Sequence, residues 1–413
     1  MAGTADAAVE SDVPARAIES HDPPDCRPRL LLLSSEFPPG PGGIGTHAFQ
    51  LALHLTRFSW NVMVLSPQAY ISAVERDTFN ARQPFSVAPL VEREAGFGWW
   101  VGRLKEINDA MRTFRPDILV ATGRRALLTA AVIHAIYRTP WVAVGHGTEF
   151  VNHTSAARLL TRRAIAGAAT VIAVSQYTAG LIREAAQLRR LIVIPNAADG
   201  ERFHPNLDAA AWRQKWVAGD GPILLTVGQV SERKAQDVVI RALPRILAGR
   251  PDTHYIIAGL PSRREEFAAL AHELGIADRV HFTGLVAAAD LPMIYNAADL
   301  FVLVSRRAAD GDVEGYGIVV QEAALSGLPA VVSRDCGLTE AIREGETGLS
   351  VPQDDPDATA EAILSLLNDE DRRREMGQRA RQLAMLSTWS ERIAEYDRVL
   401  RELIPSHSEP TRS

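Results

Sequence analysis

Cysteine is scarce in this chain of 413 residues: only Cys26 and Cys336 occur, which excludes a scaffold stapled by several disulfides. No apolar run reaches the roughly 20 residues that a membrane-spanning helix needs. Residues 1–27 are acidic, rich in proline and alanine, and lack the apolar stretch of a secretory signal peptide. We therefore expect a disordered tail over residues 1–27 and a cytoplasmic protein.

The charge is unevenly divided along the chain. The formal net charge is −6, yet residues 28–198 carry 18 Lys and Arg against 10 Asp and Glu. A basic first half beside an acidic second half indicates an anionic partner for the first half, although surface drift between two domains would give the same pattern. Nucleic acid is not expected among the partners.

Short apolar runs rich in β-branched residues alternate with stretches of helical periodicity. This alternation predicts an α/β fold with parallel sheets that are covered by helices on both faces, and the two series of runs predict two such domains. Strands are expected at 30–34, 62–65, 118–121, 141–144, 171–174 and 191–194, and then at 223–227, 255–258, 280–283, 300–304, 330–333 and 349–351.

The boundary between the domains is expected near residues 195–205, a stretch of Pro, Asn and Gly without periodicity. The first domain then spans residues 28–198 and the second residues 199–388. Apolar residues recur at helical spacing after Trp389, so a long amphipathic helix is expected over about 389–406, packing back on the first domain.

The segment FPPGPGGIG contains Gly40, Gly42 and Gly45 at the spacing of a dinucleotide-binding fingerprint. That fingerprint needs its first glycine at the end of a strand and an acidic residue after the next strand. Here SEFPP intervenes, the next strand ends in Leu-Ser-Pro, and the lysine of a phosphate-binding P-loop is missing. The segment therefore predicts a flexible glycine loop before a helix whose free backbone amides face an anion.

A second glycine-rich segment, DVEGYGIVVQEAALSGLP, places Glu314 and Glu322 around a Gly-Tyr-Gly turn. The turn opens a helix, whose N-terminal amides suit phosphate groups or sugar hydroxyls, and Glu322 can accept both hydroxyls of a ribose. The segment TVGQVSERKAQD adds Arg233 and Lys234 after a strand, where they would meet a phosphate. Spacing alone is also compatible with two solvated helix acids and a solvated basic face.

Together these segments resemble glycosyltransferase family 4, whose members are retaining enzymes of the GT-B fold. The resemblance begins near residue 29 and covers nearly the whole chain. It is carried by PPGPGGIG, VGHGTEF, VSQYTAGLI, IPNAADGERFHP, VGQVSERKAQD, VHFTGLV and EGYGIVVQEAALSGLPAV. The pattern DVEG-GIV--EA is most similar to phosphatidylinositol mannosyltransferases. The resemblance implies two facing Rossmann-like domains, with the acceptor bound by the first and a nucleotide diphosphate sugar by the second.

The resemblance also implies roles for individual residues. Glu314 is implied beside the donor sugar, and Glu322 on the ribose. Lys234 is implied on the diphosphate with Arg233. His146 is implied to contact the donor sugar near the reacting carbon, and not as a general base, because in this family the leaving phosphate itself helps to deprotonate the acceptor. The other residues implied at the donor are Gly42, Gly43, Gly228, Gln229, Leu285, Gly315, Tyr316, Gly317, Ile318 and Val319.

Two segments depart from the family pattern. Gln229 stands where the family usually has an arginine, five residues before the lysine. Either Arg233 supplies the missing charge or the diphosphate is bound more weakly. The loop RDCGLTE, residues 334–340, replaces a GG-PE-like sequence, and its contacts with sugar or acceptor stay open.

Two further features bear on partners. Asp310-Gly311-Asp312 imitates the D-x-D metal motif of the other large glycosyltransferase fold. Because cations and a helix N-terminus already face the diphosphate, we expect neither a metal ion nor another cofactor.

Arg158, Arg162 and Arg163 share one face of a predicted helix, which is either solvated or directed to an anionic acceptor or lipid surface.

The function expected from these residues is retaining transfer of a hexose from a nucleotide diphosphate sugar to a lipid, saccharide or small-molecule acceptor. Mannose from GDP-mannose is the first expectation, and glucose or N-acetylglucosamine from a UDP-sugar is the second. Two alternatives stay open. One is a nucleotide-sugar epimerase of the same fold, and the other is an inactive nucleotide-sugar-binding protein, which only Gln229 supports.

Overall fold

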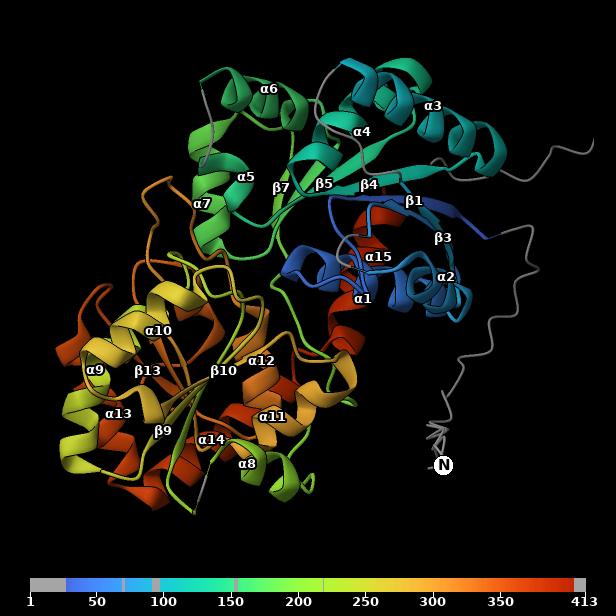
Figure 1. Cartoon of the computed structure of the whole chain (residues 1–413). Helices are drawn as coiled ribbons and strands as arrows, with labels where there is room; N and C mark the ends of the chain where they lie inside the picture. The colour runs from blue at the N-terminus through green and yellow to red at the C-terminus, as the bar shows by residue number, and fades with distance from the viewer. Residues whose placement is uncertain (1–26, 69–70, 91–96, 152–154, 218, 405–413) are drawn as a thin grey trace, which may run out of the picture.

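The computed structural model of the chain describes residues 27–68, 71–90, 97–151, 155–217 and 219–404. The tail expected over residues 1–27 therefore lies, apart from Arg27, outside the described residues. The described chain forms two α/β lobes, each built on a parallel sheet (Figure 1). None of the described helices combines the length and apolar character that crossing a bilayer requires.

The first lobe contains a seven-stranded sheet in the order β3-β2-β1-β4-β5-β6-β7. Its strands are β1 (Arg29–Ser34), β2 (Asn61–Ser66), β3 (Ser86–Pro89), β4 (Ile118–Thr122), β5 (Trp141–Gly145), β6 (Thr170–Ala173) and β7 (Leu191–Val193). The helices of this lobe are α1 (Gly43–Arg57), α2 (Ala73–Ala81), α3 (Phe97–Phe114), α4 (Arg124–Tyr137), α5 (Thr148–Val151), α6 (Ser155–Ala166) and α7 (Gln176–Ala185).

The second lobe contains a six-stranded sheet in the order β10-β9-β8-β11-β12-β13. Its strands are β8 (Ile223–Val227), β9 (His254–Ala258), β10 (Val280–Gly284), β11 (Leu300–Leu303), β12 (Ala330–Ser333) and β13 (Gly348–Val351). The helices of this lobe are α8 (Ala210–Trp216), α9 (Gln236–Gly249), α10 (Arg264–Glu273), α11 (Leu291–Ala297), α12 (Ile318–Leu325), α13 (Pro356–Leu367) and α14 (Glu370–Met385), and α15 (Trp389–Arg401) follows them.

Alternation of side chains along the strands buries both faces of each sheet. In β1, Leu30 and Leu32 pack in the core beside α1 and α15, whereas Leu31 and Leu33 pack in the core beside α3 and α4. The doubly wound α/β fold expected from the sequence is confirmed, and all twelve expected strands are present. Among the described strands, only β3 was not expected. It is a short edge strand without a buried residue, so its sequence carries no apolar signal.

Helix α15 joins the two lobes. It follows α14 of the second lobe but lies against α1 in the first (Figure 1). Its apolar stripe, which includes Trp389, Ile393 and Tyr396, is buried in a core that takes residues from both lobes. The helix ends at Arg401, earlier than the expected residue 406. A proline follows at position 405, and helices commonly end ahead of proline.

Candidate active site

The two lobes touch where segments that follow strands of both sheets come together. A Cβ atom at Gly315 would lie 1.8 Å from the carbonyl oxygen of His146, so only glycine allows this approach. The Ser175 hydroxyl, after β6, donates to the carbonyl oxygen of Gly315 at 2.6 Å. Ligands of open α/β sheets bind at the carboxyl ends of the strands, which places the candidate site at this contact.

A cluster of buried charges lies on the second-lobe side of the contact. Lys234 Nζ lies 2.6 Å from Glu314 Oε2, and the same carboxylate oxygen accepts a hydrogen bond from the Arg233 guanidinium. Burial opposes ionisation of Glu314, yet Lys234 and Arg233 together lower the pKa of its carboxyl to about 2. Burial also lowers the pKa of Lys234, and Glu314 offsets part of that effect. The Glu314 carboxyl is therefore ionised at neutral pH.

Gly228 and Gln229 directly follow β8, and their surroundings differ. Gly228 has a φ of +150°, and a Cβ atom there would lie 3.2 Å from Lys234 Cε, so the glycine gives room to the lysine stem. Gln229 is exposed, and its side-chain amide donates to Ser262 Oγ at 2.8 Å. The structure thus places Arg233 in contact with Glu314, whereas the Gln229 side chain is engaged by Ser262.

The turn before α12 is buried and lies close to the loop after β12, because a Cβ atom at Gly337 would lie 1.9 Å from the carbonyl oxygen of Gly315. Gly317 has a φ of +84° at the N-cap of α12, a conformation that favours glycine. Tyr316 and Ile318 are buried in the core, while Val319 is half-buried. Tyr316 and Ile318 can therefore serve a ligand only through their backbone amides, next to the Lys234–Glu314 pair.

His146, after β5, is held on the first-lobe side of the cleft. Its Nε2 lies 2.7 Å from Thr122 Oγ1, at the end of β4. The buried Glu149 carboxylate accepts hydrogen bonds from the backbone N–H groups of His146 and Gly147 at 3.1 and 2.9 Å. Burial lowers the pKa of His146 to about 4, so its ring is neutral near pH 7.

The glycine loop before α1 exposes Gly42 and Gly43. The carboxylate of Glu36 accepts hydrogen bonds from the backbone N–H groups of Ile44 and Gly45 at 3.0 and 3.2 Å. The expectation that the first amides of α1 are free for an anion is therefore wrong for these two groups. A side chain of this chain already caps them, and an incoming anion would have to replace it.

Glu322 is the fifth residue of α12 and lies little more than one turn inside the helix. Its Oε2 accepts a hydrogen bond from the buried Tyr295 hydroxyl at 2.6 Å. Burial raises the pKa of Glu322, and the Tyr295 bond lowers it in part. Leu285, just after β10, is 54% exposed and presents apolar surface to solvent.

The Asp310-Gly311-Asp312 segment is engaged in protein contacts. Asp312 Oδ2 lies 2.9 Å from Arg233 Nε, and Asp310 Oδ1 accepts from the backbone N–H of Asp312. Within the described residues, no group of three or more His, Cys, Asp or Glu side chains is arranged to hold a metal ion.

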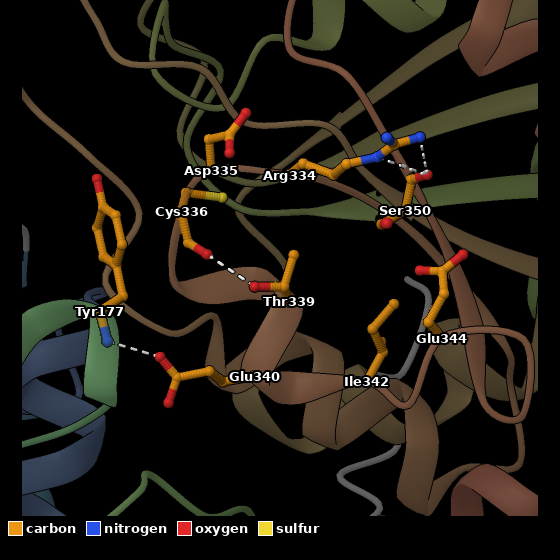
Figure 2. Close-up of a pocket in the computed structure, with 9 residues that line it drawn as sticks. All are labelled: Tyr177, Arg334, Asp335, Cys336, Thr339, Glu340, Ile342, Glu344 and Ser350. Carbon is orange, nitrogen blue, oxygen red and sulfur yellow. Dashed lines mark hydrogen bonds between the residues drawn. The ribbon is translucent and has the colours of Figure 1, made fainter.

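The departing loop RDCGLTE supports the contact between the lobes. Its Glu340 carboxylate accepts the N-terminal amides of α7, from Gln176 at 2.7 Å and Tyr177 at 2.6 Å. The Gly337 amide donates to the carbonyl oxygen of Glu314 at 2.9 Å. A cavity of about 530 Å³ lies beside this loop. Figure 2 shows Tyr177 of the first lobe facing lining residues of the second.

Two fixed cations beside a helix N-terminus form an arrangement that stabilises the negative charge of a diphosphate. Across the contact stand a neutral histidine and an exposed glycine loop. Lys234 and Arg233 contact Glu314, and the neighbouring Gly315 lies against the backbone of His146. The Gln229 side chain lies outside this group. Three residues that contact the site residues were missed from the sequence, namely Glu36, Thr122 and Tyr295. Glu36 and Thr122 carried a signal, because both are polar residues at or just after the carboxyl end of a strand.

The architecture matches that of solved structures over most of the chain. The protein HepE of Anabaena, solved with UDP and glucose, superposes with a TM-score of 0.78 at 20% identity over 91% of this chain and all of that one. Sucrose-phosphate synthase of Thermosynechococcus elongatus gives a TM-score of 0.76 at 22% identity, covering 91% of this chain and 99% of the other. These likenesses confirm the GT-B fold.

The sequence comparisons define the family. Residues 41–202 match the model described as Glycosyltransferase Family 4, and residues 208–383 match Glycosyl transferases group 1. A GDP-mannose-dependent alpha-(1-6)-phosphatidylinositol monomannoside mannosyltransferase of Mycolicibacterium smegmatis is 33% identical over 371 residues, 87% of this chain and 94% of the relative. A D-inositol 3-phosphate glycosyltransferase of Nocardia farcinica is 36% identical over 49% of this chain and 45% of its own length. The chain belongs to glycosyltransferase family 4.

Replacing Lys234 tests the charged cluster. Lys234→Ala should lower transferase turnover roughly 10²-fold, on the scale of losing one preorganised donor to a developing negative charge. Arg233→Ala should also lower turnover, and adding Gln229→Arg should restore part of it by returning a cation to the strand end. Lys215→Ala removes a lysine outside the cluster and is the matched control. Turnover of Lys234→Ala equal to that of Lys215→Ala would exclude the assignment.

Proposed function

We propose that the chain transfers mannose from GDP-mannose, with retention of the anomeric configuration, to a phosphatidylinositol mannoside or a related lipid. The observation that carries the proposal is the Lys234–Glu314–Arg233 cluster, which lies opposite His146 at the contact between the lobes. Whole-chain similarity to the M. smegmatis enzyme, whose name specifies this donor and a phosphatidylinositol monomannoside, supports both substrates. Glucose or N-acetylglucosamine from a UDP-sugar is the second candidate for the donor.

In the proposed reaction, the bond between the anomeric carbon and the β-phosphate oxygen breaks while the acceptor oxygen bonds to the same face of the sugar. The acceptor proton passes to the leaving phosphate oxygen. Lys234, Arg233 and the amides at the start of α12 face the negative charge that develops on the diphosphate. The neutral His146 ring and Gly315 line the side of the sugar, and the contact between the lobes limits access of water.

The nucleotide would lie over the second sheet. Tyr295 fixes one oxygen of Glu322, which leaves the other to accept from the ribose hydroxyls. Exposed Leu285 and the backbone near Gly284 would contact the base. We propose that no metal ion takes part, because Arg233 engages Asp312 and supplies positive charge with Lys234.

Incubation of the protein with GDP-mannose tests the reaction. With phosphatidylinositol monomannoside present, we expect a mannosylated lipid and stoichiometric GDP, equally in excess chelator and in added Mg²⁺. Conversion or elimination of the sugar without acceptor would instead indicate an epimerase. Binding without turnover of either GDP-mannose or a UDP-sugar would indicate an inactive nucleotide-sugar-binding protein, and activity lost in chelator would overturn the metal-free mechanism.

Thermal unfolding tests the ribose contact. GDP at about 100 times its dissociation constant should add about 2.7 kcal/mol of stability, whereas 2′-deoxy-GDP should add less because Glu322 loses a donor. Glu322→Ala should abolish the difference between the two nucleotides, and the exposed Glu361→Ala should preserve it. Equal shifts by GDP and 2′-deoxy-GDP in the parent protein would refute the contact, and a shift by NAD alone would restore the dinucleotide interpretation.

A basic and apolar surface on α6 suits a membrane acceptor. Arg158, Arg162 and Arg163 are exposed on this helix, beside Leu159 and Leu160, which are 44% and 54% exposed. Arginines next to exposed leucines favour binding at the interface of an anionic bilayer. We propose that this surface, the α6 face, brings the first lobe to the lipid acceptor.

Vesicle sedimentation tests the α6 face. The protein should bind vesicles that contain phosphatidylinositol and release them as salt concentration rises, because exposed charges are screened. Replacing Arg158, Arg162 and Arg163 with Glu should abolish binding. The matched control replaces Arg372, Arg374 and Arg379 of α14 with Glu, which changes the net charge equally. Loss of binding in both triple variants would assign the effect to net charge instead of to the α6 face.

A further inference from the structure

A second histidine lies directly against His146. His47 is the fifth residue of α1, is fully buried, and packs edge to face on the His146 ring, with ring centroids 5.0 Å apart and planes at 82°. Burial lowers the pKa of His47 well below its ordinary value, and His146 lowers it further. Two neutral rings therefore meet behind the cleft.

The two contacts on His146 restrict its ring in different ways. The bond from Nε2 to Thr122 Oγ1 fixes one ring nitrogen, whereas the His47 ring fixes the plane in which His146 lies. With Nε2 engaged, Nδ1 is the nitrogen left for a ligand. Rotation of the imidazole about its Thr122 bond would move Nδ1, and the His47 ring opposes that rotation.

His47 is itself held by the helix that follows the second lobe. Its Nε2 lies 2.9 Å from the hydroxyl of Tyr396 on α15. The Trp389 ring, also on α15, packs against it at 5.2 Å between centroids. A continuous series of contacts therefore runs from α15 through His47 to His146.

Packing alone is a poor explanation for a histidine here. Among the residues that the structure describes, the buried His47 Nδ1 has no hydrogen-bond partner, which destabilises the fold, and a phenylalanine would fill similar space without that cost. Buried polar groups that break the rules of packing are commonest at functional sites.

We propose that His47 is a positioning residue for His146, anchored by Tyr396, so that α15 sets the orientation of the histidine that faces the donor. The inference rests on the proposed function, because the donor-facing role of His146 does. His54 offers a matched comparison. It is also buried on α1 and stacks on Trp389, but it lies seven residues further along, about 10 Å from His47.

Four variants test the proposal with GDP-mannose as donor and phosphatidylinositol monomannoside as acceptor. His47→Leu should lower kcat at least tenfold with the donor KM within twofold, since misplaced groups slow the reaction without weakening binding. His47→Phe keeps a ring and should recover part of kcat, and Tyr396→Phe should lower kcat a few-fold. His54→Leu should lower the melting temperature as much as His47→Leu yet keep kcat within twofold.

Histidine-selective 15N NMR supplies a readout that needs no turnover. The His146 ring signals, assigned by their loss in His146→Gln, should shift in His47→Leu and in Tyr396→Phe but not in His54→Leu. The same shifts are expected if the parent protein has no transferase activity. Inactivity of the parent protein would refute the proposed function but not the positioning role of His47. The positioning role is overturned by unmoved His146 signals, by equal kcat losses in His47→Leu and His54→Leu, or by a change confined to KM. If His47→Leu does not fold, Tyr396→Phe decides by the same two readouts.

Discussion

The carboxylate of Glu314, bonded at once to Lys234 and Arg233, is the interaction on which the candidate site depends. Removing an ion from water costs several kcal/mol unless an opposite charge compensates it. The buried side chains of Lys234 and Arg233 therefore need a neighbouring anion. Glu314 supplies that anion when no donor is bound. A diphosphate carries more negative charge than one carboxylate, so a donor would meet cations that are already in place, and little reorganisation would precede the reaction.

Close backbone approach is the second constraint. Gly315 lies so near the His146 carbonyl that any side chain would collide with it, and Ser175 and Glu340 fasten the lobes on either side of that point. The candidate site therefore requires residues of both lobes. Because α15 returns from the second lobe to α1, its Tyr396 contacts His47, whose ring packs on His146.

The strands and the charged residues of the candidate site could be predicted from the sequence far better than the residues that form hydrogen bonds with the site. Apolar β-branched runs are a local signal, which is why the central strands were found and the exposed edge strand β3 was not. Lys234 and Glu314, which the structure brings into contact, could be singled out because each follows or precedes a recognisable turn. Glu36 and Tyr295 were not, since the role of each depends on a group whose position only the fold determines: the first amides of α1 for Glu36, and the Glu322 carboxylate for Tyr295.

The choice of cation at each position follows from shape. The chain has three lysines, and Lys234 is the one whose stem passes Gly228, where a Cβ atom would lie 3.2 Å from Lys234 Cε. At that approach the lysine carries its point charge on a slender unbranched stem, whereas an arginine would bring a planar guanidinium. The guanidinium of Arg233 instead contacts two carboxylates, those of Asp312 and Glu314. Arg233 thus brings a second cation to the Glu314 carboxylate, and Asp312 Oδ2 holds its Nε at 2.9 Å.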